Sequence, residues 1–142
     1  MSRRKRLASV SAEAEILRKY HKIAVVGLSS DEARESHGVA AYMQAAGYRI
    51  VPVNPAETEV LGEKAYPTVA SIPATVEIVN VFRRSEAVPG VVDDAIAAGA
   101  KVIWMQEGIV NEEAAAKARQ AGLEVVMDRC IRSEHRRMAA SV

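Results

Sequence analysis

Short apolar runs alternate with amphipathic segments along most of this chain. Five runs have the composition of strands, and they are KIAVVGL (22–28), YRIVPV (48–53), VEIVNVF (76–82), KVIWMQ (101–106) and LEVVMD (123–128). Their apolar residues are continuous rather than alternating with polar ones, which is typical of parallel strands covered on both faces. The pattern therefore predicts an α/β fold built on a five-stranded parallel sheet.

The segments between these runs carry helix signals. Residues 36–48, 88–100 and 111–123 have apolar residues at helical spacing, and each contains a glycine that can end a helix just before the next strand. Residues 11–20 begin at Ser11, which can cap a short extra N-terminal helix. We predict a single Rossmann-like, doubly wound domain with helices on both faces of the sheet.

The topology follows from this alternation. With the strands numbered along the chain, we expect the order 3-2-1-4-5 and a ligand crevice at the carboxyl ends of strands one and four, where the order reverses. Residues 54–75 hold three prolines and no clear period, so they predict a loop crossover with one short helical turn around TVASI. We expect residues 1–10 to form a flexible basic tail and residues 11–142 to form the domain.

Composition narrows the function. A length of 142 residues fits one domain, and 19 basic against 18 acidic residues disfavour a dedicated nucleic-acid binder. We expect the basic segments SRRKR (2–6) and RSEHRR (132–137) to be solvated tails. No apolar run approaches the ~20 residues that span a bilayer, and the single cysteine, Cys130, fits a reducing compartment. We predict a cytoplasmic protein without a membrane or nucleic-acid partner; a protein partner or a homo-oligomer stays open.

The loop after the first strand has the anatomy of an anion site. In VVGLSSDEARESHG (25–38) a strand breaks at a glycine and restarts as a helix, an arrangement that directs backbone N–H groups and the helix dipole at a phosphate. The familiar G-x-G-x-x-G spacing is absent. Gly27 permits a tight turn, the serines that follow offer donors, and Arg34 can bind a phosphate through two hydrogen bonds. A plain strand-to-helix turn with a solvated arginine is the alternative.

Two further loops belong to the same predicted edge. Asn54 and Pro55 follow strand two without the acidic residue that usually binds ribose in a dinucleotide site, because the nearest carboxylate, Glu57, lies beyond the proline; NAD is therefore disfavoured. VFRRSE (81–86) brings two adjacent arginines, of which one can face the crevice and join Arg34 around a polyphosphate. Phe82 can stack on an adenine or pack in the core.

The last two loops offer weaker candidates for catalysis. Glu107 can be a general acid or base, or a carboxylate that accepts bonds from its own loop. Cys130 and His135 suggest a thiolate–imidazole pair, whereas a buried cysteine and a structural histidine are the simpler interpretation. Paired carboxylates, a Ser-His-Asp spacing and a metal-ligand cluster are missing from the sequence, so we predict no catalytic and no metal-binding residue.

Several segments together resemble a known family. VVGLSSDEARESHGVAAYMQAAGYRIVPVNP, VNVFRRSEAVP, IWMQEGIVNEEAAAKARQAG and VVMDRCIRSEH look like the small bacterial and archaeal CoA-binding proteins, which resemble the CoA-binding Rossmann domain of the succinyl-CoA synthetase α subunit. The resemblance covers residues 12–138 and implies a stand-alone domain that holds coenzyme A. The synthetase's phosphorylated histidine lies in a separate domain outside these residues, so ligase activity is not implied.

The resemblance also implies where each part of coenzyme A lies. The diphosphate is expected at Gly27, Leu28, Ser29, Arg34 and Ser36, and the adenosine at Val53, Asn54 and Pro55; further contacts are expected from Phe82, Arg83, Arg84, Val88, Trp104 and Gln106. We interpret the protein as a binder of CoA or acyl-CoA that acts as a non-catalytic carrier, sensor or subunit. The alternatives are an enzyme or redox module using Cys130, Glu107 or His135 on a CoA thioester or CoA disulfide, and an NAD(P)-binding domain.

Overall fold

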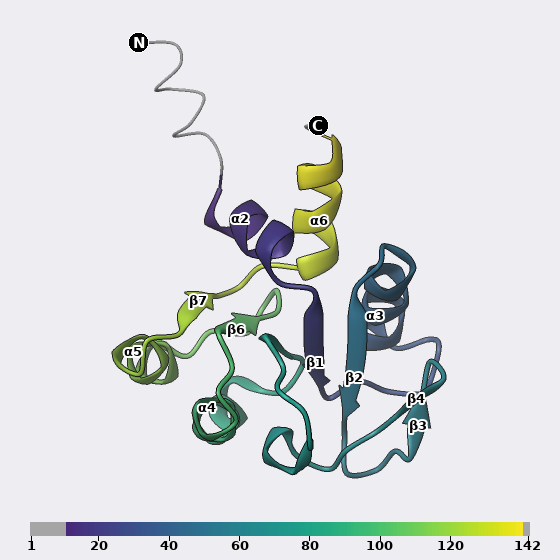
Figure 1. Ribbon diagram of the computed structural model, residues 1–142, viewed down its shortest axis with the longest axis horizontal. Helices are drawn as coiled ribbons and strands as arrows, with labels where there is room; N and C mark the ends of the chain where they lie inside the picture. Colours follow the sequence, from purple (N-terminus) through teal and green to yellow (C-terminus); the bar gives the residue numbers. More distant parts are fainter. Residues whose placement is uncertain (1–10, 141–142) are drawn as a thin grey trace.

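The central sheet is the feature that organises the molecule. A computed structural model describes residues 11–140, so the predicted tail at 1–10 lies outside the described residues. Five parallel strands form the sheet (Figure 1), and they are β1 (Lys22–Val26), β2 (Arg49–Val53), β5 (Ile78–Val81), β6 (Val102–Met105) and β7 (Glu124–Val126). The predicted fold class is confirmed, and so is the extra helix α2 (Ala12–Lys19), which Ser11 caps by accepting a hydrogen bond from the Ala14 N–H.

Helices cover both faces of the sheet (Figure 1). Helices α3 (Glu35–Ala45) and α6 (Ile131–Ala140) pack with α2 on one face, and α4 (Val88–Ala97) and α5 (Glu112–Gln120) pack together on the other. The predicted turn around TVASI is the 3-10 helix η1 (Val69–Ser71), and a second 3-10 helix, η2 (Ser85–Ala87), leads into α4.

The strand order corrects the prediction. Numbered along the chain, the strands lie in the order 2-1-3-4-5, so β1 pairs directly with the third strand, β5, and the second strand is at the edge. Pro52 in β2 explains this, because a proline cannot donate to a neighbouring strand and is confined to an edge. Conversely, β5 is buried along its whole length, as an interior strand must be. The order therefore reverses at β1 and β5, not at strands one and four.

Two other segments also differ from expectation. RSEHRR lies inside α6 rather than in a solvated tail, because Ile131, Glu134 and Met138 recur at helical spacing and face the core or its border. The crossover at 54–75 contains a small antiparallel hairpin, β3 (Glu59–Val60) and β4 (Glu63–Lys64), in addition to its loops.

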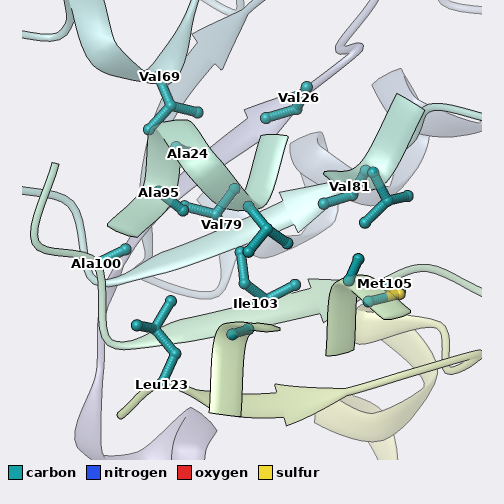
Figure 2. Close-up of a cluster of buried hydrophobic side chains, with 14 of the residues drawn as sticks. Ala24, Val26, Val69, Val79, Val81, Ala95, Ala100, Ile103, Met105 and Leu123 are labelled. Carbon is teal, nitrogen blue, oxygen red and sulfur yellow. The ribbon is translucent and has the colours of Figure 1, made fainter. Parts of the chain in front are cut away.

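The core consists of two apolar layers, one on each side of the sheet. Figure 2 shows the layer beneath α4 and α5, in which valines and an isoleucine of the central strands meet small helix residues such as Ala95. Alanines at 114, 115 and 118 let α5 approach the sheet closely. The other layer contains Trp104, Leu17 and Ile131 beneath α2, α3 and α6. Both faces of the sheet are thus closed by helices.

An aromatic and imidazole cluster joins α3, α6 and the start of β2, away from that edge. Tyr42 Oη and His135 Nδ1 are hydrogen-bonded at 2.8 Å, the ring of Tyr48 lies edge-on to His135, and Tyr48 Oη donates to the Leu17 carbonyl at 2.6 Å. Burial lowers the pKa of His135 below its usual range, since the charged imidazolium loses hydration there.

This shift predicts a stability that falls in acid. The folded state binds fewer protons at His135 than the unfolded state, so stability is lost as the pH falls through the unfolded value of about 6.5. We expect the melting temperature to fall less between pH 7.5 and pH 5.5 in His135→Gln than in the parent protein. Thermal melts across that range measure the difference, and parallel curves for the two proteins would contradict it.

Candidate functional site

One row of residues crosses the carboxyl edge of the sheet immediately after the strands end. The register pairs Val26 with Val81 and Val81 with Met105, so the next residues, Gly27, Phe82 and Gln106, continue the row. Their N–H groups donate to the Val53, Val26 and Val81 carbonyls at 2.7, 2.8 and 3.3 Å respectively. The loops after these strands therefore gather at one edge, with the reversal of strand order between Gly27 and Phe82.

Gly27 is the tightest point of the row. Its φ of +92° is a conformation that residues with a side chain rarely adopt, and a Cβ at this position would lie 2.7 Å from the Phe82 carbonyl oxygen. The glycine thus lets the chain turn from β1 into the following loop while the end of β5 lies directly against it.

Hydrogen bonds fix the loop between Gly27 and α3. The Ser29 N–H donates to the Ser36 hydroxyl at 3.1 Å, and His37 Nδ1 lies 3.0 Å from the Ser29 carbonyl oxygen. The Asp31 N–H donates to the Ser29 hydroxyl at 3.0 Å. Ser36 is buried and supports the loop through its side chain. The result is a preformed turn that leads into the N-terminus of an eleven-residue helix.

A cleft of about 380 Å³ lies over this turn and is called the α3 cleft here. Arg34 sits at the N-cap position of α3 with an exposed side chain, 4.0 Å from the Asp31 carboxylate. Six of the seven lining residues were predicted from the sequence, and only Glu35 was not; the lining consists of Gly27, Ser29, Arg34, Glu35, Ser36, Asn54 and Phe82.

The loop after β2 is fastened to the loop after β1. Asn54 donates from Nδ2 to the Leu28 carbonyl at 3.0 Å, and its Oδ1 accepts from the Ala56 N–H. The Glu57 carboxylate accepts from the Ser30 N–H at 2.8 Å. Glu57 therefore stabilises the loop after β1, and the hydrogen bonds of Asn54 hold this residue in place where it lines the α3 cleft.

A second cleft, of about 360 Å³, opens on the other side of Gly27, toward α4; it is called the α4 cleft here. Val53, Thr68, Arg83 and Asp94 are among its lining residues. A Cβ on Gly27 would lie 3.2 Å from Cδ of Arg83, so this arginine of the α4 cleft passes close to Gly27, which lines the α3 cleft. Arg84 does not line the α4 cleft but joins Arg83 in a further hollow of about 330 Å³ with Glu86 and Ala87. Of the two adjacent arginines, Arg83 thus lines the α4 cleft and Arg84 does not.

The remaining predicted residues lie outside the two clefts. Leu28, Val88 and Trp104 are fully buried in the apolar layers, and Pro55 is exposed in its loop. Trp104 donates from Nε1 to the Arg129 carbonyl at 2.8 Å, which fastens the loop after β7 to the sheet. Gln106 is also buried, at 1% exposure. The sequence pattern near the end of a strand does not distinguish a residue that is buried in the core from one that lines a cleft.

Comparison with known proteins identifies the family. Residues 21–136 match the family model of the CoA binding domain. The chain belongs to this family. The uncharacterized protein YneT of Bacillus subtilis (strain 168) is 49% identical over 121 residues, which are 85% of this chain and 90% of that protein. The resemblance noted in the sequence is confirmed at the level of the family.

Solved structures extend the comparison for this CoA-binding domain. A hypothetical protein from Pyrococcus horikoshii OT3 superposes with a TM-score of 0.87 at 43% identity, covering 89% of each chain. The dinucleotide-forming acetyl-coenzyme A synthetase 1 of Ca. Korarchaeum cryptofilum superposes with a TM-score of 0.66 at 28% identity, over 75% of this chain and 26% of the synthetase. The same domain thus occurs in small chains and as part of a much larger synthetase.

The three residues considered for catalysis in this CoA-binding domain do not form a linked set. Glu107 is exposed, Cys130 is half-buried at the start of α6, and His135 belongs to the cluster with Tyr42. Among the described residues, no group of three or more His, Cys, Asp or Glu side chains could hold a metal ion. Within residues 11–140, no helix is long and apolar enough to cross a membrane.

Proposed function

We propose that this domain binds coenzyme A or an acyl-CoA across the carboxyl ends of β1 and β5, and that it acts as a non-catalytic carrier, sensor or subunit. The observation that carries the proposal is the turn at Gly27, where a preformed loop, the N-terminus of α3 and the carboxyl end of β5 meet around the α3 cleft. Such a turn suits an anion, because backbone N–H groups and the positive end of a helix converge there.

The residues of the two clefts fit the parts of coenzyme A. The diphosphate would lie at Gly27, Ser29 and the first turn of α3, with Arg34 as an exposed cation at the rim. Asn54 would contact the adenosine from the neighbouring loop. Arg83 would meet the ligand between the α3 and α4 clefts. Leu28, Val53, Pro55 and Val88 would hold the backbone of these loops rather than contact charges, and Arg84 would act from the outer hollow.

A titration panel tests the ligand. We expect isothermal titration calorimetry to show that CoA and acetyl-CoA bind more tightly than ADP or NAD, since only the first two carry both the charged nucleotide and the pantetheine arm. Equal affinity for CoA and ADP would reduce the proposal to a generic nucleotide site. Turnover of acetyl-CoA on incubation with the protein would contradict the non-catalytic role.

Arg34 offers a direct test of the anion site. We expect Arg34→Ala to weaken CoA binding by about 1.5–3 kcal/mol, the range for hydrogen bonds to charged groups. Because the side chain is exposed and its ion pair with Asp31 is long, at 4.0 Å, the melting temperature should change little. Arg119→Ala, an exposed arginine on α5, is the matched control. Equal CoA affinity in the two variants would remove Arg34 from the site.

A further inference from the structure

Three basic side chains line one hollow at the amino end of the sheet, opposite the proposed ligand site. The hollow has a volume of about 150 Å³ and lies where the crossover passes the starts of β1 and β2, at the end of the sheet where α2 leads into β1 (Figure 1). Lys22, Arg49 and Lys64 belong to its lining, and Glu63 is the one acidic residue in the part of that lining that the structure describes. Three positive charges thus face one negative charge in what is called the basic hollow here.

The sheet itself brings two of these cations side by side. Lys22 and Arg49 are partners in the register of β1 and β2. Residues in register on neighbouring strands lie about 4.8 Å apart and point to the same face, here the face on which Ala24 and Val51 pack. Like charges directly opposite each other on neighbouring strands repel. The fold therefore maintains a repulsion that a bound anion would relieve.

Within the described residues, no carboxylate forms an ion pair with these three cations. Glu77 lies next to Lys22, but its Oε1 accepts from the His21 and Lys22 N–H groups at 2.9 and 3.1 Å. Nζ of Lys64 lies 5.3 Å from the centre of the Tyr66 ring. The positive charge of the basic hollow is thus available to a ligand.

The edge strand β2 adds a backbone donor to the basic hollow. The Arg49 N–H donates to the His21 carbonyl at 2.8 Å, toward β1, so the next residue, Ile50, directs its N–H away from β1. The crossover meets this outer edge further along the strand, where the Tyr66 N–H donates to the Pro52 carbonyl at 3.0 Å. Because Ile50 lines the hollow, its N–H is placed to donate to a ligand there.

Size and lining indicate the class of ligand. A volume of about 150 Å³ corresponds to about five water molecules at ~30 Å³ each, which is too little for a nucleotide. Val51, Ile72 and Pro73 provide apolar lining that can contact a short carbon chain. Lysine and arginine bind carboxylates and phosphates through charge-assisted hydrogen bonds, and several cations together match more than one negative charge.

We propose that the basic hollow binds a small oxyanion with two negative charges, either a dicarboxylate or a phosphate. Lys22, Arg49 and Lys64 hold the charges, and the Ile50 N–H donates to one oxygen. The site is independent of the proposed function, because the five residues of β1 separate it from Gly27 by about 16 Å. The anion and CoA therefore do not compete.

Amide chemical shifts test this site, because they separate it from the anion site proposed at Gly27. The ¹⁵N-labelled protein is titrated with succinate, inorganic phosphate and acetate, with NaCl keeping the ionic strength constant. We expect succinate or phosphate to cause saturable shifts at the Ile50 and Lys64 amides, and singly charged acetate to bind about fivefold more weakly.

Two variants remove one exposed cation each. Arg49→Gln and Lys64→Gln should weaken the binding about fivefold, whereas Arg119→Gln, at an exposed position on α5, should leave it unchanged. The spectrum of each variant verifies its fold, and either variant suffices if the other does not fold.

Each result supports or overturns the site. Saturation by succinate alone assigns a dicarboxylate, saturation by phosphate alone assigns a phosphate, and saturation by both assigns a site that recognises charge. Shifts that grow linearly with concentration, that NaCl reproduces, or that keep their affinity in every folded variant overturn the site; the cations then serve to keep other chains away from the β2 edge. Saturable shifts at Ile50 in a protein that does not bind CoA would contradict the proposed function alone.

Discussion

Replacing Gly27 with alanine should lower the free energy of unfolding by about 3 kcal/mol and abolish CoA binding. A φ of +92° costs a residue with a side chain on the order of 1–3 kcal/mol, and the new Cβ would in addition lie 2.7 Å from the Phe82 carbonyl oxygen. The N–H of Phe82 donates a hydrogen bond to the Val26 carbonyl. The Phe82 carbonyl therefore cannot move away from the new Cβ without disturbing the pairing of β1 and β5. Chemical denaturation and calorimetry measure the two effects.

Gly99→Ala is the matched control for this prediction. Gly99 also has a positive φ, +76°, but a Cβ there would meet no atom within 4 Å. The control therefore carries the conformational cost alone, on the order of 1–2 kcal/mol, and it leaves the two clefts intact. If Gly27→Ala proved no more destabilising than Gly99→Ala and still bound CoA, the close approach of Phe82 would not shape the site.

The sequence predicts the sheet and most helices because their signals are local. Continuous apolar runs are typical of parallel strands that helices cover on both faces, and a glycine after each of three amphipathic segments marks where the helix ends. Strand order is not local, since it depends on how the 54–75 crossover passes the sheet. One local signal did bear on it: Pro52 excludes β2 from the interior, which rules out an order with strand two between its neighbours.

The α3 cleft could be predicted for a related reason. In a parallel sheet the loop that follows each strand falls on one edge, so Gly27, Asn54 and Phe82 lie on the same edge whichever neighbours the strands have. Helix α6 could not be predicted in the same way, because Ile131 is the only apolar residue among its first seven and the buried position Glu134 carries a charged side chain.

Phe82 and Trp104 have similar positions in the sequence but differ in where the fold places them. Trp104 and Phe82 both occur near the end of an apolar strand, and either can stack on an adenine. The structure places Phe82 at the α3 cleft, whereas Trp104 is fully enclosed between the sheet and the helices α2, α3 and α6. The two side chains lie on the same face of the sheet, but Trp104 lies within β6, whereas Phe82 belongs to the row just beyond the strand ends.

Trp104 should consequently matter for stability and not for ligand affinity. We expect Trp104→Ala to cost about 3–5 kcal/mol, the range for removing a large aromatic side chain from a core. Trp104→Phe should cost about 1–3 kcal/mol, because it keeps most of the volume but leaves the Arg129 carbonyl without its indole donor. Denaturant titrations give both values.

Ligand binding by the Trp104→Phe variant decides between the two roles of this residue. A core residue predicts that the folded variant binds CoA within twofold of the parent protein, whereas a ligand contact predicts a weaker complex at unchanged stability. Trp104 is the single tryptophan of the chain, so its fluorescence reports on this site alone. Because the ring is enclosed, we expect CoA to leave the emission maximum of the parent protein unchanged. A clear shift of the maximum, together with weaker CoA binding by the variant, would show that Trp104 contacts the ligand.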